Sequence, residues 1–190
     1  MSGTGISTTP KEATQLAILG IVARAPALGT EIVSLVKHIV GRSWQPTSDV
    51  IAVNLEELQA RRLVTRADVG RDWDTTRYAI TEDGRRVLHD LLRAPLPPSP
   101  VGPDSSAIAL KVCFLDLLEP DEAAEQVAAL LGLYDREIRH SRDAVARCAC
   151  DWPYVPGWME LEVTRLVAER DWFRDLQRRL RPTEAVGGAG

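Results

Sequence analysis

Residues 64–85 read VTRADVGRDWDTTRYAITEDGR, and this stretch decides the fold. Two runs rich in β-branched residues, 64–69 and 75–80, flank the five-residue segment 70–74, a pattern that is typical of a β-hairpin. Thr81-Glu82-Asp83 then supplies a capping residue followed by acidic residues, which predicts a helix from there to about Arg93. The stretch therefore predicts a two-stranded ribbon with a helix directly after it.

Three short helices are expected before this ribbon. Thr9-Pro10-Lys11-Glu12 carries the cap, the proline and the glutamate of a helix start, and the helix should reach about Ala25. A second helix is expected from about Gly29 to Val40, and a third after a cap at Thr47 or Ser48. The spacing of apolar residues in the third helix turns one stripe inward: Ile51, Leu55 and Leu58. The order predicts a winged helix-turn-helix domain over residues 10–94.

A proline-rich segment separates this domain from the second half of the chain. Residues 95–106 read PLPPSPVGPDSS, and prolines at this density interrupt helix and sheet, so the segment is expected to be a linker. The last residues, 182–190, are expected to form a disordered tail. Overall the sequence predicts a mainly α-helical protein.

Residues 107–181 are expected to form a helical dimerisation domain. A short helix over about 107–118 precedes a long one from Pro120 to about Cys150. A last helix places apolar residues at intervals of seven: Met159, Leu166, Phe173 and Leu180. The two long helices are expected to pair as an antiparallel hairpin. Because a lone hairpin leaves a wide apolar surface, we expect a second copy of the chain to cover it.

The charge of the chain argues against indiscriminate binding of polyanions. Its 190 residues include 23 lysines and arginines and 27 acidic residues, so the net charge is −4. Residues 1–94 hold 12 basic and 11 acidic groups, whereas residues 95–190 hold 11 and 16, so the first half is the candidate partner of a nucleic acid. The sequence has neither a long apolar run nor the pattern of a signal peptide, and a cytoplasmic protein is expected.

The residues that usually carry catalysis or bind metals are scattered. The three cysteines, an odd number, are expected to be reduced thiols, and Cys148 and Cys150 would point apart on a helix rather than chelate one ion. The histidines, at positions 38, 89 and 140, fall on separate expected helices, and no serine elbow or glycine-rich phosphate loop accompanies them. No enzymatic activity, cofactor or metal is therefore expected.

Residues 14–181 resemble the PadR family of winged-helix transcriptional regulators, in the subgroup with a helical C-terminal dimerisation domain. The resemblance is most specific over RYAITEDGR at 77–85. It extends to LAILGIV at 16–22, Gly29 with Glu31-Ile32, Trp44 and Pro46, LEEL at 55–58, Leu63-Val64, Leu110-Lys111, Phe114-Leu115 and Trp172-Phe173. It implies a homodimeric regulator, more often a repressor, that binds a palindromic DNA operator.

The chain departs from this family at several positions. Val50-Ile51-Ala52-Val53 stands where family members usually carry Thr-Ile-Tyr-Pro, so the common DNA-contacting tyrosine is missing. Arg62 stands where a glycine often precedes the Leu-Val strand entry, and Leu28 and Thr30 replace the family's histidine and tyrosine beside the glycine. The operator of this chain therefore does not follow from better-known relatives.

The third helix and the wing supply the candidate DNA contacts. The inward stripe of the third helix turns Asp49, Ala52, Val53 and Glu56 outward, where Ala52 and Val53 suit thymine methyls and Asp49 suits cytosine N4. Thr47 and Ser48 suit a phosphate at a helix N-terminus. Six arginines are expected to supply the positive charge: Arg42, Arg61, Arg62, Arg66, Arg77 and, at the wing tip, Arg71. The alternative for these arginines is that they only keep the surface soluble. Trp73, also at the wing tip, would in the alternative interpretation fold back onto the hairpin.

Aromatic residues of the second half are the candidate effector site. Trp152, Tyr154, Trp158 and Trp172 are expected to line an aromatic pocket, since the resemblance implies sensors that bind flat aromatic compounds near the dimer interface. The alternative is that they anchor the core and the interface.

A rival function is a winged-helix adaptor that binds a protein and not DNA, which the acidic pair Glu56 and Glu57 favours.

Overall fold

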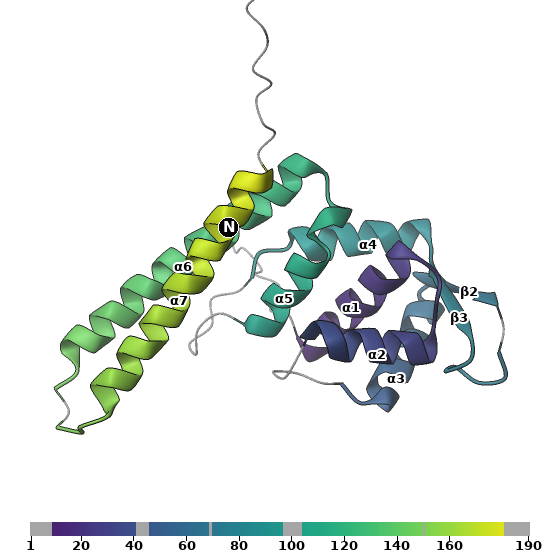
Figure 1. Ribbon diagram of the computed structural model, residues 1–190. Helices are drawn as coiled ribbons and strands as arrows, with labels where there is room; N and C mark the ends of the chain where they lie inside the picture. Colours follow the sequence, from purple (N-terminus) through teal and green to yellow (C-terminus); the bar gives the residue numbers. More distant parts are fainter. Residues whose placement is uncertain (1–8, 41–45, 69, 97–103, 150, 181–190) are drawn as a thin grey trace, which may run out of the picture. The chain divides into compact units, whose positions relative to one another are not determined.

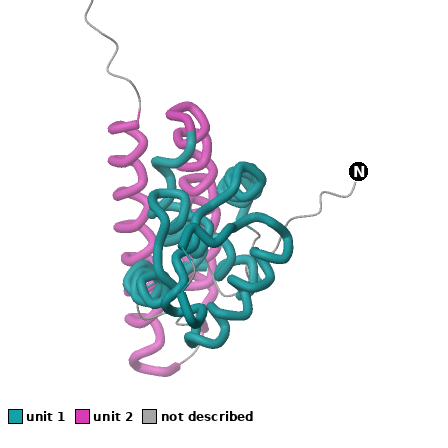
Figure 2. Tube along the Cα trace, turned by 90° about the vertical axis from the view of Figure 1, so that its right-hand side faces the viewer, with its two compact units in different colours: residues 1–97, 104–118 teal, residues 98–103, 119–190 magenta. Residues whose placement is uncertain are grey.

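The computed structural model describes residues 9–40, 46–68, 70–96, 104–149 and 151–180. The chain divides into two compact units, one of residues 1–97 with 104–118 and one of residues 98–103 with 119–190 (Figure 2). In the described residues, no helix combines the length and the apolar composition that a membrane crossing needs.

Helix α1 (Pro10–Arg24) forms the centre of the first unit. The expected capping box is present, because Glu12 N donates to Thr9 Oγ1 at 3.2 Å and Thr9 N donates to Glu12 Oε2 at 2.8 Å. Every residue from Ala13 to Ala23 is buried. Figure 1 shows α1 between α2 (Gly29–Val40) and α4 (Glu82–Arg93). Helix α1 also packs against α3 (Ser48–Ala60).

The helices around α1 follow the predicted boundaries closely. Helix α2 occupies the expected residues, and α3 begins after Thr47, whose Oγ1 accepts a hydrogen bond from Val50 N at 3.4 Å. The predicted inward stripe of α3 is confirmed, since Ile51, Leu55 and Leu58 are fully buried. Helix α4 begins after Thr81, whose Oγ1 accepts from Gly84 N at 3.0 Å.

The predicted hairpin is confirmed, and it belongs to a three-stranded antiparallel sheet. Strands β2 (Val64–Asp68) and β3 (Arg77–Ile80) pair with an irregularity between Arg66 and Asp68. The two-residue strand β1 (Ala27–Leu28) pairs with the other edge of β3, giving the order β1-β3-β2. Sequence analysis did not predict β1, because a pair of residues shows no alternation to detect.

Helix α5 (Ser105–Cys113) belongs to the first unit. It begins after Asp104, which caps it, and a 3-10 turn, η1 (Leu115–Leu117), follows it, so the short helix expected over 107–118 ends earlier. A Cβ on Gly20 of α1 would lie 2.5 Å from the Phe114 ring, which shows how closely α1 and the end of α5 pack. In the structure α5 therefore lies with the winged helix, whereas sequence analysis grouped it with the second half.

The second unit contains the expected antiparallel pair of long helices, α6 (Pro120–Arg147) and α7 (Val155–Leu180). The Tyr134 and Phe173 rings lie 5.3 Å apart between them, and Tyr134 Oη donates to Glu169 Oε2 at 2.9 Å. Burial and this hydrogen bond raise the pKa of Tyr134. Of the apolar residues at intervals of seven, Leu166 and Phe173 are buried and Met159 and Leu180 are half-buried.

Candidate nucleic-acid interface

Helix α3 exposes a continuous face of mixed character. Ser48, Asp49 and Val53 are exposed, Val53 with 62 % of its surface, and Ala52 is half-buried. This is the face that the spacing of the inward residues predicts. Arg42, which sequence analysis grouped with these residues, lies outside the described residues.

The two adjacent glutamates of α3 have different surroundings. Glu57 turns toward α1, where its carboxylate accepts hydrogen bonds from Lys11 Nζ at 2.5 Å and from Gln15 Nε2 at 3.2 Å. Gln15 is buried, and its Oε1 in turn accepts from Arg61 Nη1 at 3.2 Å. Glu56 is exposed on the same side of α3 as Val53. Only Glu56 of this pair would therefore oppose an approaching phosphate.

The wing carries one exposed cation at its tip. Arg71 is exposed, and Arg66 on β2 is exposed with its Nε donating to Gln59 Oε1 at 3.3 Å. The tip folds on itself, because Thr76 Oγ1 and Thr76 N both donate to the Asp72 carbonyl. These bonds fix the backbone of Asp72, next to Arg71, whose side chain is exposed.

Trp73 folds back from the wing onto the start of α2. It is half-buried, and a Cβ added to Gly29 would lie 2.6 Å from its ring and would also meet its carbonyl oxygen. Thr30 N donates to the Asp74 carbonyl at 3.2 Å and fixes the same contact. Gly29 is thus required by a close approach of two segments.

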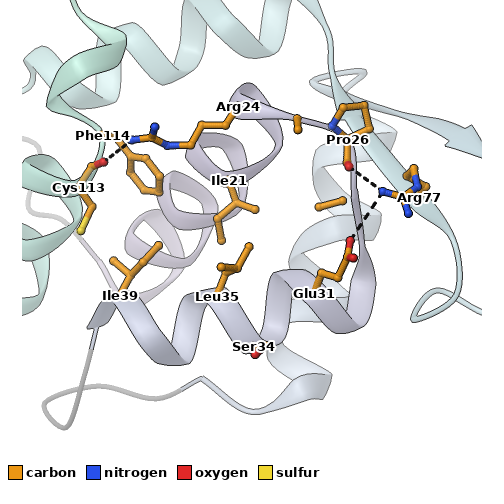
Figure 3. A pocket seen from close by; sticks show the side chains of 12 residues that line it. Ile21, Arg24, Pro26, Glu31, Ser34, Leu35, Ile39, Arg77, Cys113 and Phe114 are labelled. Carbon is orange, nitrogen blue, oxygen red and sulfur yellow. Dashed lines mark hydrogen bonds and ion pairs between the residues drawn. The ribbon is translucent and has the colours of Figure 1, made fainter.

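Arg77 is directed away from the wing tip. Its Nη1 donates to the Pro26 carbonyl at 2.8 Å and lies 3.7 Å from Glu31 Oε2 (Figure 3). These partners engage the guanidinium within the first unit. Arg66 and Arg71 are therefore more accessible than Arg77.

Arg77 also lines a pocket that sequence analysis did not predict. The pocket has a volume of about 730 Å³, and Ile21 and Leu35 point toward one another across it (Figure 3). The other end holds Arg24, whose Nη2 donates to the Cys113 carbonyl at 2.8 Å and to Asp116 Oδ1 at 2.7 Å. Burial raises the pKa of the Cys113 thiol. The residues come from α1, α2, β3 and α5, and no short motif in the sequence joins them.

The four aromatic residues proposed from the sequence lie in the second unit and are exposed. Trp152, Tyr154 and Trp158 expose 69 %, 86 % and 64 % of their surfaces. Trp172 is 49 % exposed and meets the Phe173 ring edge-on at 5.0 Å. The pocket between α6 and α7 near Arg142 and Val163, of about 410 Å³, is lined by other residues. Within one chain these aromatic residues therefore form an outer surface.

Comparison with protein families decides the class of the chain. Residues 4–177 match the model of the putative AphA-like transcriptional regulators. The chain belongs to this family. The winged-helix regulator recognised from the sequence is thereby confirmed, and the AphA-like chain is a transcriptional regulator. No curated protein sequence matches it significantly.

Several solved structures are similar to the AphA-like chain. Bacillus subtilis PadR in complex with operator DNA shares 20 % identity, with 90 % of this chain and 99 % of that chain covered and a TM-score of 0.43. The same protein in complex with p-coumaric acid shares 19 %, covering 90 % and 97 %, with a TM-score of 0.42. The Vibrio cholerae virulence activator AphA shares 17 %, covering 88 % and 95 %, with a TM-score of 0.39.

Proposed function

We propose that this regulator is a homodimer that binds a palindromic DNA operator and represses transcription. The observation that carries the proposal is the exposed face of α3, beside a wing with an exposed arginine at its tip. In a winged helix this arrangement suits α3 to the major groove and the wing to the neighbouring backbone or minor groove.

Each proposed contact has a chemical reason. The methyl groups of Ala52 and Val53 suit thymine, and the Asp49 carboxylate accepts from cytosine N4. The wing-tip guanidinium of Arg71 suits the minor groove or a phosphate. The remaining proposed contacts hold the backbone: Arg42, Thr47, Ser48 and Arg66.

Exposed apolar residues of the second unit support the dimer. Trp158, Leu161 and Trp172 expose 64 %, 56 % and 49 % of their surfaces and recur at helical spacing along α7. A surface of this kind is rarely left to water, and a two-fold pair of hairpins would cover it. Light scattering tests this step: the wild type is expected to be a dimer, and a Trp158→Ser, Leu161→Ser double variant a monomer. A wild-type monomer at micromolar concentration would contradict it.

Two sites are proposed for a small aromatic effector that releases DNA. Trp152, Tyr154, Trp158 and Trp172 would line a site only once a second chain covers them, whereas the pocket of the first unit is complete in one chain. Its size falls in the range of ligand pockets, roughly 300–1,000 Å³. Leu35→Asp would block the pocket, and Tyr154→Ser would remove an aromatic residue outside it. The variant that abolishes quenching of tryptophan fluorescence by an aromatic compound identifies the site.

The rival function is a winged-helix adaptor that binds a protein. The exposed carboxylate of Glu56 on α3 favours it, since this charge repels phosphate. Selection from a random pool of duplexes separates the two functions. The proposal expects a two-fold symmetric motif, and Val53→Ser should change its preference at one base pair in each half-site. Failure of the wild type to enrich any motif would favour the adaptor.

A further inference from the structure

Arg62, between α3 and β2, has an unusual backbone conformation. Among the described residues other than glycine, it alone has a positive φ, at 59°. This left-handed region is unfavourable for a residue with a Cβ and is the usual place of glycine. A residue that keeps such a conformation often has a functional reason to do so.

The conformation arises from the way α3 ends. Leu63 N donates to the Leu58 carbonyl and Arg62 N to the Gln59 carbonyl, both at 2.9 Å. These two bonds form a Schellman motif, in which Arg62 occupies the left-handed position that favours glycine. The buried side chains of Leu58 and Leu63 complete the motif.

The neighbouring elements leave this corner no freedom to relax. Thr81 Oγ1 donates to the Arg62 carbonyl at 2.8 Å and lies 3.1 Å from the Leu63 carbonyl oxygen. A Cβ added to Gly84, in the first turn of α4, would clash with that same Leu63 oxygen. The backbone of Arg62 is thus fixed by α3, β2 and α4 together.

No contact of the Arg62 side chain inside the described part of the protein accounts for an arginine at this position. The side chain is exposed, and within the described ranges no hydrogen bond or ion pair of its guanidinium is found. A cation near the end of α3 favours the helix dipole, but Arg61 already lies there. Glycine would therefore fit the backbone better without removing an internal contact.

The position of Arg62 suggests what its guanidinium does. It follows a helix whose outer face carries Asp49 and Glu56, and it stands between two other exposed arginines, Arg61 and Arg66. A polyanion that approaches α3 meets repulsion at the carboxylates and attraction at this end. We propose that Arg62 binds a DNA backbone phosphate, and that the strained backbone is retained for this contact. The inference rests on the proposed DNA-binding function.

The test pairs a stability measurement with a salt titration of DNA binding. The full chain is titrated against a 24-base-pair duplex of mixed sequence at several salt concentrations, because a phosphate contact is independent of sequence. Three variants are compared: Arg62→Gly, Arg62→Gln, and Arg142→Gln on α6 as a control that removes one exposed charge of the second unit.

The two Arg62 variants are expected to differ in stability and to agree in binding. Arg62→Gly should raise the Tm by about 2–4 °C, because it relieves the left-handed backbone, whereas Arg62→Gln should not raise it. Both should weaken binding about three- to ten-fold at low salt and reduce the salt slope by about one for each chain. Arg142→Gln should change neither quantity.

Each contrary result overturns the inference in a recognisable way. A higher Tm with an unchanged salt slope would mean that Arg62 contacts no phosphate. A lower Tm for Arg62→Gly would mean that the side chain stabilises the helix end instead. Absence of salt-dependent binding by the wild type would overturn the proposed function together with the inference, whereas wild-type binding with an unaffected Arg62→Gly would overturn the inference alone.

Discussion

Glu57 on α3 accepts a hydrogen bond from Lys11 Nζ on α1 at 2.5 Å, across 46 positions of sequence. The same carboxylate accepts from buried Gln15, so it serves the packing of α1 against α3. Its neighbour Glu56 has the same chemistry and faces solvent. Two adjacent glutamates thus have different roles, and substitutions separate them.

Glu56→Ala and Glu57→Ala are expected to affect different properties, DNA affinity and stability respectively. Glu57→Ala removes partners of Lys11 and Gln15 and should lower the free energy of unfolding by about 1 kcal/mol. Glu56→Ala should leave stability within about 0.5 kcal/mol and strengthen binding to duplex DNA about two- to five-fold at low salt, since it removes a repelling charge. Chemical denaturation and fluorescence anisotropy measure the two effects. Equal effects of both variants on DNA affinity would contradict this division of roles.

The contact of the wing with α2 predicts a strong effect at a single glycine. In Gly29→Ala the new methyl group would overlap the carbonyl and the ring of Trp73, and the free energy of unfolding should fall by about 1–3 kcal/mol. Gly157→Ala in the first turn of α7 is the matched control, because a Cβ there meets nothing within 4 Å. The control should be neutral or stabilising. A red shift of the tryptophan emission is expected for Gly29→Ala and not for the control.

The wing tip predicts an electrostatic effect without a structural one. Arg71→Ala should reduce the salt slope of DNA binding by about one for each chain and leave the Tm unchanged. Arg165→Ala on α7, also an exposed arginine, is the control for loss of charge. If Arg71→Ala binds DNA as the wild type does, the wing has no part in binding.

Buried Lys111 predicts a pH dependence of stability. Its Nζ donates to the Leu92 carbonyl at the end of α4, and burial lowers its pKa to about 8 from 10.5. Between these values the unfolded chain binds more protons than the folded one, so stability rises with pH. The free energy of unfolding should rise by on the order of 1–2 kcal/mol from pH 7.5 to 9.5, and nearly all of this rise should occur above pH 8. Chemical denaturation of the wild type and of Lys111→Met at several pH values isolates the contribution of Lys111. An identical pH profile of stability for both proteins would contradict the lowered pKa of Lys111.

The sequence predicted the helices of the first unit because local signals mark them. Thr9, Thr47 and Thr81 each occupy the capping position expected from their side chains, and the stripe of Ile51, Leu55 and Leu58 identified the face that α3 buries. These signals depend on a few neighbouring residues. Strand β1 depends instead on pairing with β3, which is far away in the sequence, and no local sequence pattern predicts it.

The candidate site was predictable only in part. Helical spacing predicted the exposure of Asp49 and Val53, but it could not separate Glu56 from Glu57, since that depends on Lys11 and Gln15 of another helix. The sequence predicted Arg77 as a cation available to DNA, whereas its place on β3 puts its guanidinium beside Pro26 and Glu31. The strain at Arg62 had a signal in the sequence, an arginine where relatives often carry glycine, but its hydrogen bonds required the structure.

The central claim is that this regulator recognises a particular DNA sequence. Fluorescence anisotropy with a labelled duplex from the region upstream of its own gene, against a scrambled duplex of equal composition, tests it most directly at fixed, near-physiological salt. Preference for the native duplex by a factor of roughly 10³ or more is expected, with the affinity falling steeply as salt rises. Equal and weak binding to both duplexes would contradict the claim for this region, and equal binding across a pool of genomic fragments would contradict it altogether.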